Sequence, residues 1–128
     1  YASLGFSLGQ HPLAFLRPRL RRLATAERIQ TLPNGAYVHT AGLVTIRQRP
    51  GSAQGVIFIT MEDETGVVNV IVWPSLIEQQ RRIVVGARLL GVRGKVQREG
   101  DVIHVVASRL EDYSEWLGEL STSSRDFH

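Results

Sequence analysis

Residues 55–73 constrain the fold more than any other segment, because they have the pattern of two strands joined by a tight turn. Both halves are rich in alternating β-branched residues, and the polar run Glu62–Gly66 lies between them. This pattern is typical of a β-hairpin. Phe58 and Asn69 fall on the same face of the predicted hairpin. An aromatic ring and an amide on one sheet face can stack a nucleobase and hydrogen-bond to its edge.

Further strand-like segments surround this hairpin. Gly42, in the middle of the first of them, allows the bend of a strand shared by both halves of a small barrel. A short helix is predicted at 74–82, with Ser75 as its cap. The five predicted strands are 36–48, the two arms of the hairpin, 87–98 and 102–107. Three strands, a helix and two strands predict an all-β, five-stranded Greek-key barrel of the OB type.

The chain divides into three predicted parts: a linker and short helical segment at 1–35, the OB-fold domain at 36–109, and a C-terminal helix and tail at 110–128. The chain starts at Tyr1 rather than Met, so we expect a piece of a longer protein.

Helix signals mark both flanking parts. Pro12 suits the first turn of a helix that Pro18 is expected to interrupt, and Thr25 is a candidate cap for another helical turn. In the tail, a spacing typical of a short amphipathic helix is shown by Leu110, Trp116, Leu117 and Leu120.

Composition limits the possible locations and partners. The chain has no Cys, which excludes disulfides and thiolate metal sites and fits a reducing compartment. No apolar run approaches membrane-spanning length, and the first residues lack a signal-peptide pattern. We therefore expect a cytoplasmic protein without a membrane partner.

Charge is distributed unevenly along the chain. Residues 1–109 hold 14 of the 15 basic residues but only 7 of the 12 acidic ones. Residues 110–128 hold one basic residue, Arg125, and five acidic residues. A basic body with an acidic tail favours a polyanionic partner for the body. Ordinary surface charge is an equally good explanation.

The predicted nucleic-acid site is centred on the hairpin. Phe58, Thr60 and Asn69 are expected to face outward, with Phe58 stacking on a base and Asn69 bonding to a base edge. The alternative is that Phe58 packs under the N-terminal helix and Asn69 caps a strand edge. Phosphate contacts are expected from Arg47 and Arg49, which end the first strand, and from Arg93 and Lys95, which share one face of the fourth. Alternatively, Arg47 and Arg49 lie in a solvated loop. For Arg93 and Lys95, the alternative is a solvated strand face.

Neither catalytic nor metal-binding chemistry is predicted. Residues 62–64 are acidic, but they lie in a hairpin turn, where such residues serve turn geometry. The four His residues are scattered, and no phosphate-binding Gly loop or nucleophile–base pair is present. We expect no catalytic residue, no metal and no cofactor in this chain.

The segment Gln10–Phe15 loosely fits the pattern of peptides that dock on the bacterial sliding clamp. Such peptides are extended and exposed, whereas these apolar residues are expected to pack a helix onto the barrel. We therefore favour packing of this segment over direct contact with the clamp, and recruitment to the clamp stays an alternative.

Three segments carry a family resemblance: Gly42–Gly51, Gly55–Pro74 and Ser124–His128. They resemble the C-terminal end of bacterial error-prone DNA polymerases, which are similar to the polymerase III alpha subunit and act in damage-induced translesion synthesis (the ImuC type). The resemblance covers about 8–128. It implies that the polymerase domain, with its catalytic carboxylates, lies upstream and that the parent chain is a nucleotidyltransferase of DNA replication and repair.

The hairpin is also similar to the anticodon-binding OB domains of class II aminoacyl-tRNA synthetases, where the positions of Phe58 and Asn69 read bases. Together these features predict a module that holds the single-stranded DNA template near the polymerase.

Two alternatives are kept. The chain could dock the polymerase onto partner proteins, which the resemblance implies include a Y-family-like accessory subunit and other products of the same mutagenesis cassette. Trp116, Arg125 and Phe127 in the acidic tail would then form the docking peptide. The barrel could also simply brace the polymerase.

Overall fold

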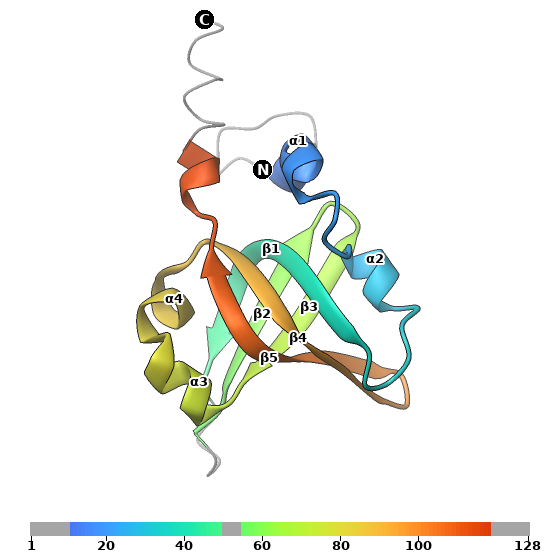
Figure 1. Ribbon diagram of the computed structural model, residues 1–128, viewed down its shortest axis with the longest axis vertical. Coiled ribbons are helices and arrows are strands. Elements are labelled where there is room, and N and C mark those ends of the chain that lie inside the picture. Colours follow the sequence, from blue (N-terminus) through green and yellow to red (C-terminus); the bar gives the residue numbers. More distant parts are fainter. Residues whose placement is uncertain (1–10, 50–54, 119–128) are drawn as a thin grey trace, which may run out of the picture.

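The computed structural model describes residues 11–49 and 55–118, and its five strands close into a barrel in the order β1-β2-β3-β5-β4 (Figure 1). The strands are β1 (Tyr37–Gln48), β2 (Ile57–Asp63), β3 (Gly66–Val72), β4 (Leu89–Glu99) and β5 (Val102–Asp112). This architecture confirms the predicted five-stranded OB barrel.

Strand β1 serves both halves of the barrel. Its first part pairs with β4, up to Leu43 opposite Leu89, and its last part pairs with β2, up to Gln48 opposite Phe58. Gly42 lies where the strand changes partner. A Cβ at this position would lie only 3.0 Å from the Glu62 carbonyl oxygen, so the close approach of β1 and β2 requires glycine.

The parallel pairing of β3 with β5 closes the barrel, with Ile71 opposite Val106. Strand β5 continues to Asp112, beyond the predicted end at Ala107, because it pairs with β4 along most of its length. Leu110 is therefore a buried strand residue, 1% exposed, and its assignment to the C-terminal helix is wrong.

The barrel interior is filled by one face of each strand. Every second residue of the hairpin is buried, as predicted. These inward residues are Ile57, Ile59, Met61, Val68, Val70 and Val72. Burial of such a face supplies most of the driving force for closing the sheet.

Two short helices, α3 (Pro74–Gln79) and α4 (Arg81–Gly86), replace the single helix predicted at 74–82 and lie beside β5 (Figure 1). The residue before α3 is Trp73, with no side-chain capping bond, so the predicted cap at Ser75 is wrong. Gln80, between the helices, exchanges two hydrogen bonds of 2.8 Å with the backbone of Leu110. This pair fixes the helices to β5.

Helix α1 (Pro12–Leu20) begins at Pro12 as expected, but it continues through Pro18. Its buried face, formed by Leu13, Leu16 and Leu20, packs on a second apolar cluster with Leu89 and Leu117. Tertiary packing of this face outweighs the hydrogen bond that Pro18 cannot donate. The prediction that Pro18 interrupts the helix is therefore wrong.

The second apolar cluster also holds the start of the C-terminal segment, where a helical turn begins at Glu115. The Trp116 ring lies parallel to that of Tyr113, with centroids 4.5 Å apart. The Arg19 guanidinium of α1 lies 5.3 Å from the Trp116 ring. Stacking and cation–π contacts thus join the two ends of the described chain over the barrel.

The acidic turn between β2 and β3 holds the N-terminal helices through Asp63, whose side chain is fully buried. One carboxylate oxygen of Asp63 accepts from Thr65 and Gly66 within the turn. The other accepts from the backbone N–H of Ala26, at the start of α2 (Ala26–Ile29), at 2.7 Å. Asp63 therefore fixes the turn and α2 together.

The first three backbone N–H groups of α2 all have side-chain acceptors, two in the β2–β3 turn and one at Thr25. Glu27 donates to the hydroxyl of Thr65, and Arg28 donates to Thr25, which confirms the predicted cap. A four-residue helix is too short to be stable alone, so these bonds account for its presence.

Arg17 of α1 adds an ion pair to the same turn. Its guanidinium forms two hydrogen bonds to Glu64, of 2.6 and 2.7 Å, and lies 3.7 Å from Asp63. The paired guanidinium holds the pKa of Glu64 below its ordinary value of 4.5, although burial opposes the shift. This bidentate, half-buried pair anchors α1.

We predict that Asp63→Ala lowers the free energy of unfolding by about 2–4 kcal/mol, because buried N–H donors lose their acceptor. Urea denaturation measures the change. Asp101→Ala, at an exposed aspartate in the β4–β5 turn, is the matched control and should cost less than about 0.5 kcal/mol. Equal, small effects at both positions would contradict the role of Asp63.

We also predict an acid-sensitive contribution from Glu64. Since its folded-state pKa is depressed, the stabilisation is complete above about pH 4.5 and is lost as the pH falls through the lower folded-state pKa. Stability should therefore fall less steeply from about pH 5 to about pH 3 in Glu64→Gln than in the parent. Denaturation at several pH values measures this, with exposed Glu78→Gln as control. The same slope in the parent and Glu64→Gln would refute the prediction.

Candidate nucleic-acid interface

The outward face of the β2–β3 hairpin presents the residues predicted for base contact. Phe58 and Thr60 are half-buried and Asn69 is exposed. Thr60 lies directly opposite Asn69, and its hydroxyl lies 3.4 Å from the Asn69 carbonyl oxygen. Phe58 is two pairs further along, opposite Ile71. The predicted outward orientation is confirmed, whereas their roles in binding remain predictions.

Strand β5 adds an aromatic residue that the sequence analysis missed. The His104 ring lies 6.3 Å from the Phe58 ring between centroids, at an interplanar angle of 56°. This tilted geometry lies within the range of favourable aromatic contacts. The alternation of side chains along β5 could have revealed His104, because its neighbour Val105 points inward and adjacent strand residues point to opposite faces.

The same outer surface continues onto β4 and β1. Lys95 pairs with Val106 on one side and with Tyr37 on the other, and its ammonium lies 5.1 Å from the Tyr37 ring. Gln97 lies opposite His104. We use the name outer belt for the set Tyr37, Phe58, Thr60, Asn69, Ile71, Lys95, Gln97, His104 and Val106. The outer belt combines aromatic rings, amides and a cation, the groups that bind single strands.

Exposed cations border the outer belt. Arg93 lies two residues before Lys95 on the outward face of β4, as predicted, and is opposite the exposed Arg109 of β5. Arg49, also exposed, comes directly after β1. These positions can supply phosphate contacts at the two sides of the belt.

Part of the charge on Arg93 is balanced by Glu111, whose carboxylate accepts from Arg93 Nε at 3.1 Å. Burial raises the pKa of Glu111, but hydrogen bonds from Arg93 and Tyr113 outweigh it and leave the pKa below its ordinary value. Burial of His39 lowers the pKa of its imidazole, whose Nε2 lies 3.6 Å from a Glu111 carboxylate oxygen. Glu111 is thus a fixed negative charge beside Arg93.

Two arginines are held by helix ends. Arg47 donates from Nε to the Val84 carbonyl at 2.7 Å and from a terminal nitrogen to the Ala87 carbonyl, at the end of α4. Arg98 bonds in the same way to the carbonyls of Gln30 and Leu32, after α2. Such bonds satisfy helix C-terminal carbonyls. The structure therefore groups Arg47 with α4 rather than with the outer belt, and its phosphate contact stays a prediction.

Of the predicted docking residues, Trp116 stacks on Tyr113 and contacts Arg19, whereas Arg125 and Phe127 lie outside the described residues. In the clamp-like segment, Leu13 is buried on the barrel and Phe15 is half exposed, while Gln10 lies outside the described residues. The apolar packing expected for this segment is thus confirmed for Leu13.

Within residues 11–49 and 55–118, no three His, Asp or Glu side chains are grouped so as to hold a metal ion. No helix in these ranges is both long and apolar enough to cross a bilayer.

Comparison with known proteins places the closed barrel in a class. The model of the family described as "OB-fold nucleic acid binding domain" matches residues 28–113, which include all five strands. The chain belongs to this family.

The chain matches part of several larger proteins. The chain is 58% identical, over its whole length, to "Error-prone DNA polymerase" of Azoarcus sp. (strain BH72) and of Alkalilimnicola ehrlichii, and 55% identical to that of Ralstonia nicotianae. It spans only 12–13% of the length of these relatives.

Solved structures share the fold at low identity. Asparaginyl-tRNA synthetase from Pyrococcus horikoshii matches 72% of this chain with 23% of its own, at a TM-score of 0.60 and 23% identity. The OBody AM1L10, solved bound to hen egg-white lysozyme, matches 70% of this chain with 89% of its own, at a TM-score of 0.57 and 14% identity. These likenesses support the fold alone.

Proposed function

We propose that this domain binds single-stranded DNA along the outer belt, as the template-holding module of an error-prone translesion DNA polymerase. The observation that carries the proposal is the contact of Phe58 with His104 beside Thr60 and Asn69. These side chains offer a stacking surface and hydrogen-bonding groups on one exposed face. Membership of a nucleic-acid-binding family supports the same assignment.

The chemistry favours a single strand over a duplex. Rings on a convex barrel can stack only on bases that are already unpaired and splayed. Lys95, Arg93 and Arg109 would follow the backbone, while Asn69 would bond to a base edge. Because every base has a π-face and phosphate contacts carry no sequence information, we expect weak binding with little sequence preference.

The link to a polymerase is supported by relatives that match the chain over its full length. In this proposal catalysis belongs to other parts of a cytoplasmic nucleotidyltransferase that acts at damaged DNA, and the OB module contributes template affinity. The ImuC type, similar to the polymerase III alpha subunit, is the proposed subclass.

Docking to a Y-family-like accessory subunit or other cassette proteins remains an alternative for the tail. Its expected anchors, Arg125 and Phe127, lie outside the described residues, and Trp116 contacts Tyr113 and Arg19. Because Trp116 already packs within the domain, the described part of the chain favours the nucleic-acid role.

We predict that a labelled oligothymidylate binds with log K falling against log salt with a slope of about −2 to −3, for three or four phosphate contacts at about 0.7 each. Phe58→Ala should weaken binding by about 1–3 kcal/mol through loss of base stacking. The slope should stay the same, because the cations remain. Fluorescence anisotropy over a salt series measures both quantities.

Val85→Ala, which truncates an exposed apolar residue of α4 outside the outer belt, is the matched control and should bind like the parent. Absence of binding at low salt would refute the proposal. A large loss of stability in Phe58→Ala with unchanged affinity per folded molecule would show that Phe58 is a packing residue.

A further inference from the structure

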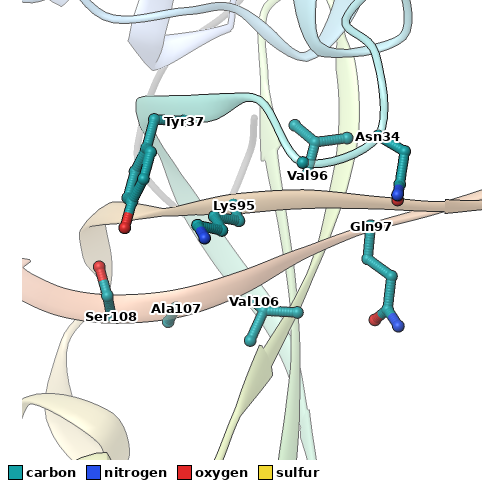
Figure 2. Close-up of a pocket in the computed structure, with 9 residues that line it drawn as sticks. Asn34, Tyr37, Lys95, Val96, Gln97, Val106, Ala107 and Ser108 are labelled. Atoms are coloured by element: carbon teal, nitrogen blue, oxygen red, sulfur yellow. The ribbon is translucent and has the colours of Figure 1, made fainter.

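A pocket of about 360 Å³ lies beside the hairpin face, between β1, β4 and β5 (Figure 2). Val106 and Ala107 of β5 form an apolar part of its wall, and Val106 also belongs to the outer belt. Tyr37 lies at one end of the pocket and Asn34 and Gln97 lie toward the other (Figure 2). The pocket thus has an aromatic end and an amide end joined by an apolar surface.

The aromatic end of the pocket is accessible from outside. Tyr37 is 73% exposed although it lies at the first position of a barrel strand. The Lys95 ammonium, 5.1 Å from its ring, lies within cation–π distance. Because the ammonium lies over one face of the ring, a planar base would stack on the other face, and the ammonium can pair with the phosphate of the same nucleotide.

The amide end is partly fixed in orientation. The Asn34 carbonyl oxygen accepts from the backbone N–H of Arg98 at 2.8 Å, which directs the NH₂ group of Asn34 away from that contact. Gln97 is an exposed outward residue of β4. Amide groups in the lining of the same pocket as an aromatic ring match the donors and acceptors on a base edge.

The pocket is continuous with the proposed binding face. Val106 lies opposite Ile71 on one side and opposite Lys95 on the other, and Gln97 lies opposite His104. A Cβ on Gly94 would lie 2.2 Å from the Val106 carbonyl oxygen, so β4 and β5 approach closely at the register shift beside the pocket. A strand that leaves Phe58 across β3 and β5 therefore reaches the pocket without crossing a gap in the sheet.

We propose that this pocket is a second nucleotide subsite for the same DNA strand. Tyr37 stacks on the base, Lys95 pairs with the phosphate, and Asn34 and Gln97 bond to the base edge. The inference rests on the proposed single-strand binding and extends its path around the barrel. The ligand is a single nucleotide unit of an unpaired strand, several positions away from the one that contacts Phe58.

The test compares oligothymidylates of about 4 to 12 nucleotides, a span that covers the lower range of OB-fold site sizes. Tyr37→Ala should bind the shortest oligomers like the parent and the longer ones roughly 5- to 150-fold more weakly. Tyr37→Phe, which keeps the ring, should bind all lengths like the parent. Phe58→Ala should weaken binding at every length. Thermal melting should be unchanged in the Tyr37 variants, because the side chain is exposed.

Each outcome has a separate meaning. If the parent binds no oligomer, the proposed function itself fails, and the subsite fails with it. If Phe58→Ala weakens binding but Tyr37→Ala matches the parent at every length, the subsite is overturned while the proposed function stands, and a peptide becomes the alternative ligand of the pocket. If Tyr37→Ala weakens the binding of oligomers of all lengths equally, the subsite does not lie beyond the nucleotide that contacts Phe58, and its placement is overturned.

A second measurement identifies the contact directly. Photocrosslinking with an oligomer that carries 5-iodouracil at single positions should label Tyr37 from positions near one end only, and Tyr37→Phe should retain the label. The oligomer must be long enough for Tyr37→Ala to weaken its binding. If such an oligomer labels Tyr37 from no position, the subsite is contradicted.

Discussion

The buried carboxylate of Asp63 is the interaction on which the arrangement of the domain depends. It orders the β2–β3 turn from one oxygen and holds the start of α2 from the other. Arg17 adds the bidentate pair with Glu64 and brings α1 to the same turn. Because the turn joins the two strands that present Phe58 and Asn69, the contacts that seat the N-terminal helices also support the proposed binding face. The turn end of the hairpin is thereby fixed before any ligand arrives.

Net charge is a poor guide to which arginines face a polyanion. Arg17 is paired with carboxylates, while Arg47 and Arg98 bond to the carbonyls that end short helices. Charge-assisted bonds of this kind are worth more to the fold than surface ion pairs are. The cations left on the outward faces, among them Lys95 and Arg109, are those that can contribute to a salt-dependent interaction.

Local periodicity sufficed to predict what depends on one strand alone. The burial of Ile59 and the outward position of Phe58 follow from alternation, and the same rule applied to β5 would have found His104. Contacts between distant segments could not be predicted in this way. Arg17 meets Glu64 47 residues away, and Arg47 reaches the end of α4. Helix α1 continues through Pro18 because of the cluster beneath it, which no local propensity encodes.

The central claim is that the outer belt, and no other surface, receives a single strand. Titration of the ¹⁵N-labelled domain with a short oligothymidylate, followed by amide chemical shifts, tests it most directly. The shifts should cluster on β2, β3 and β5 around Phe58, Asn69 and His104, and the amides of α2 and of the turn at Asp63 should not shift. Shifts confined to α1 and the segment around Trp116, with the outer belt silent, would contradict it.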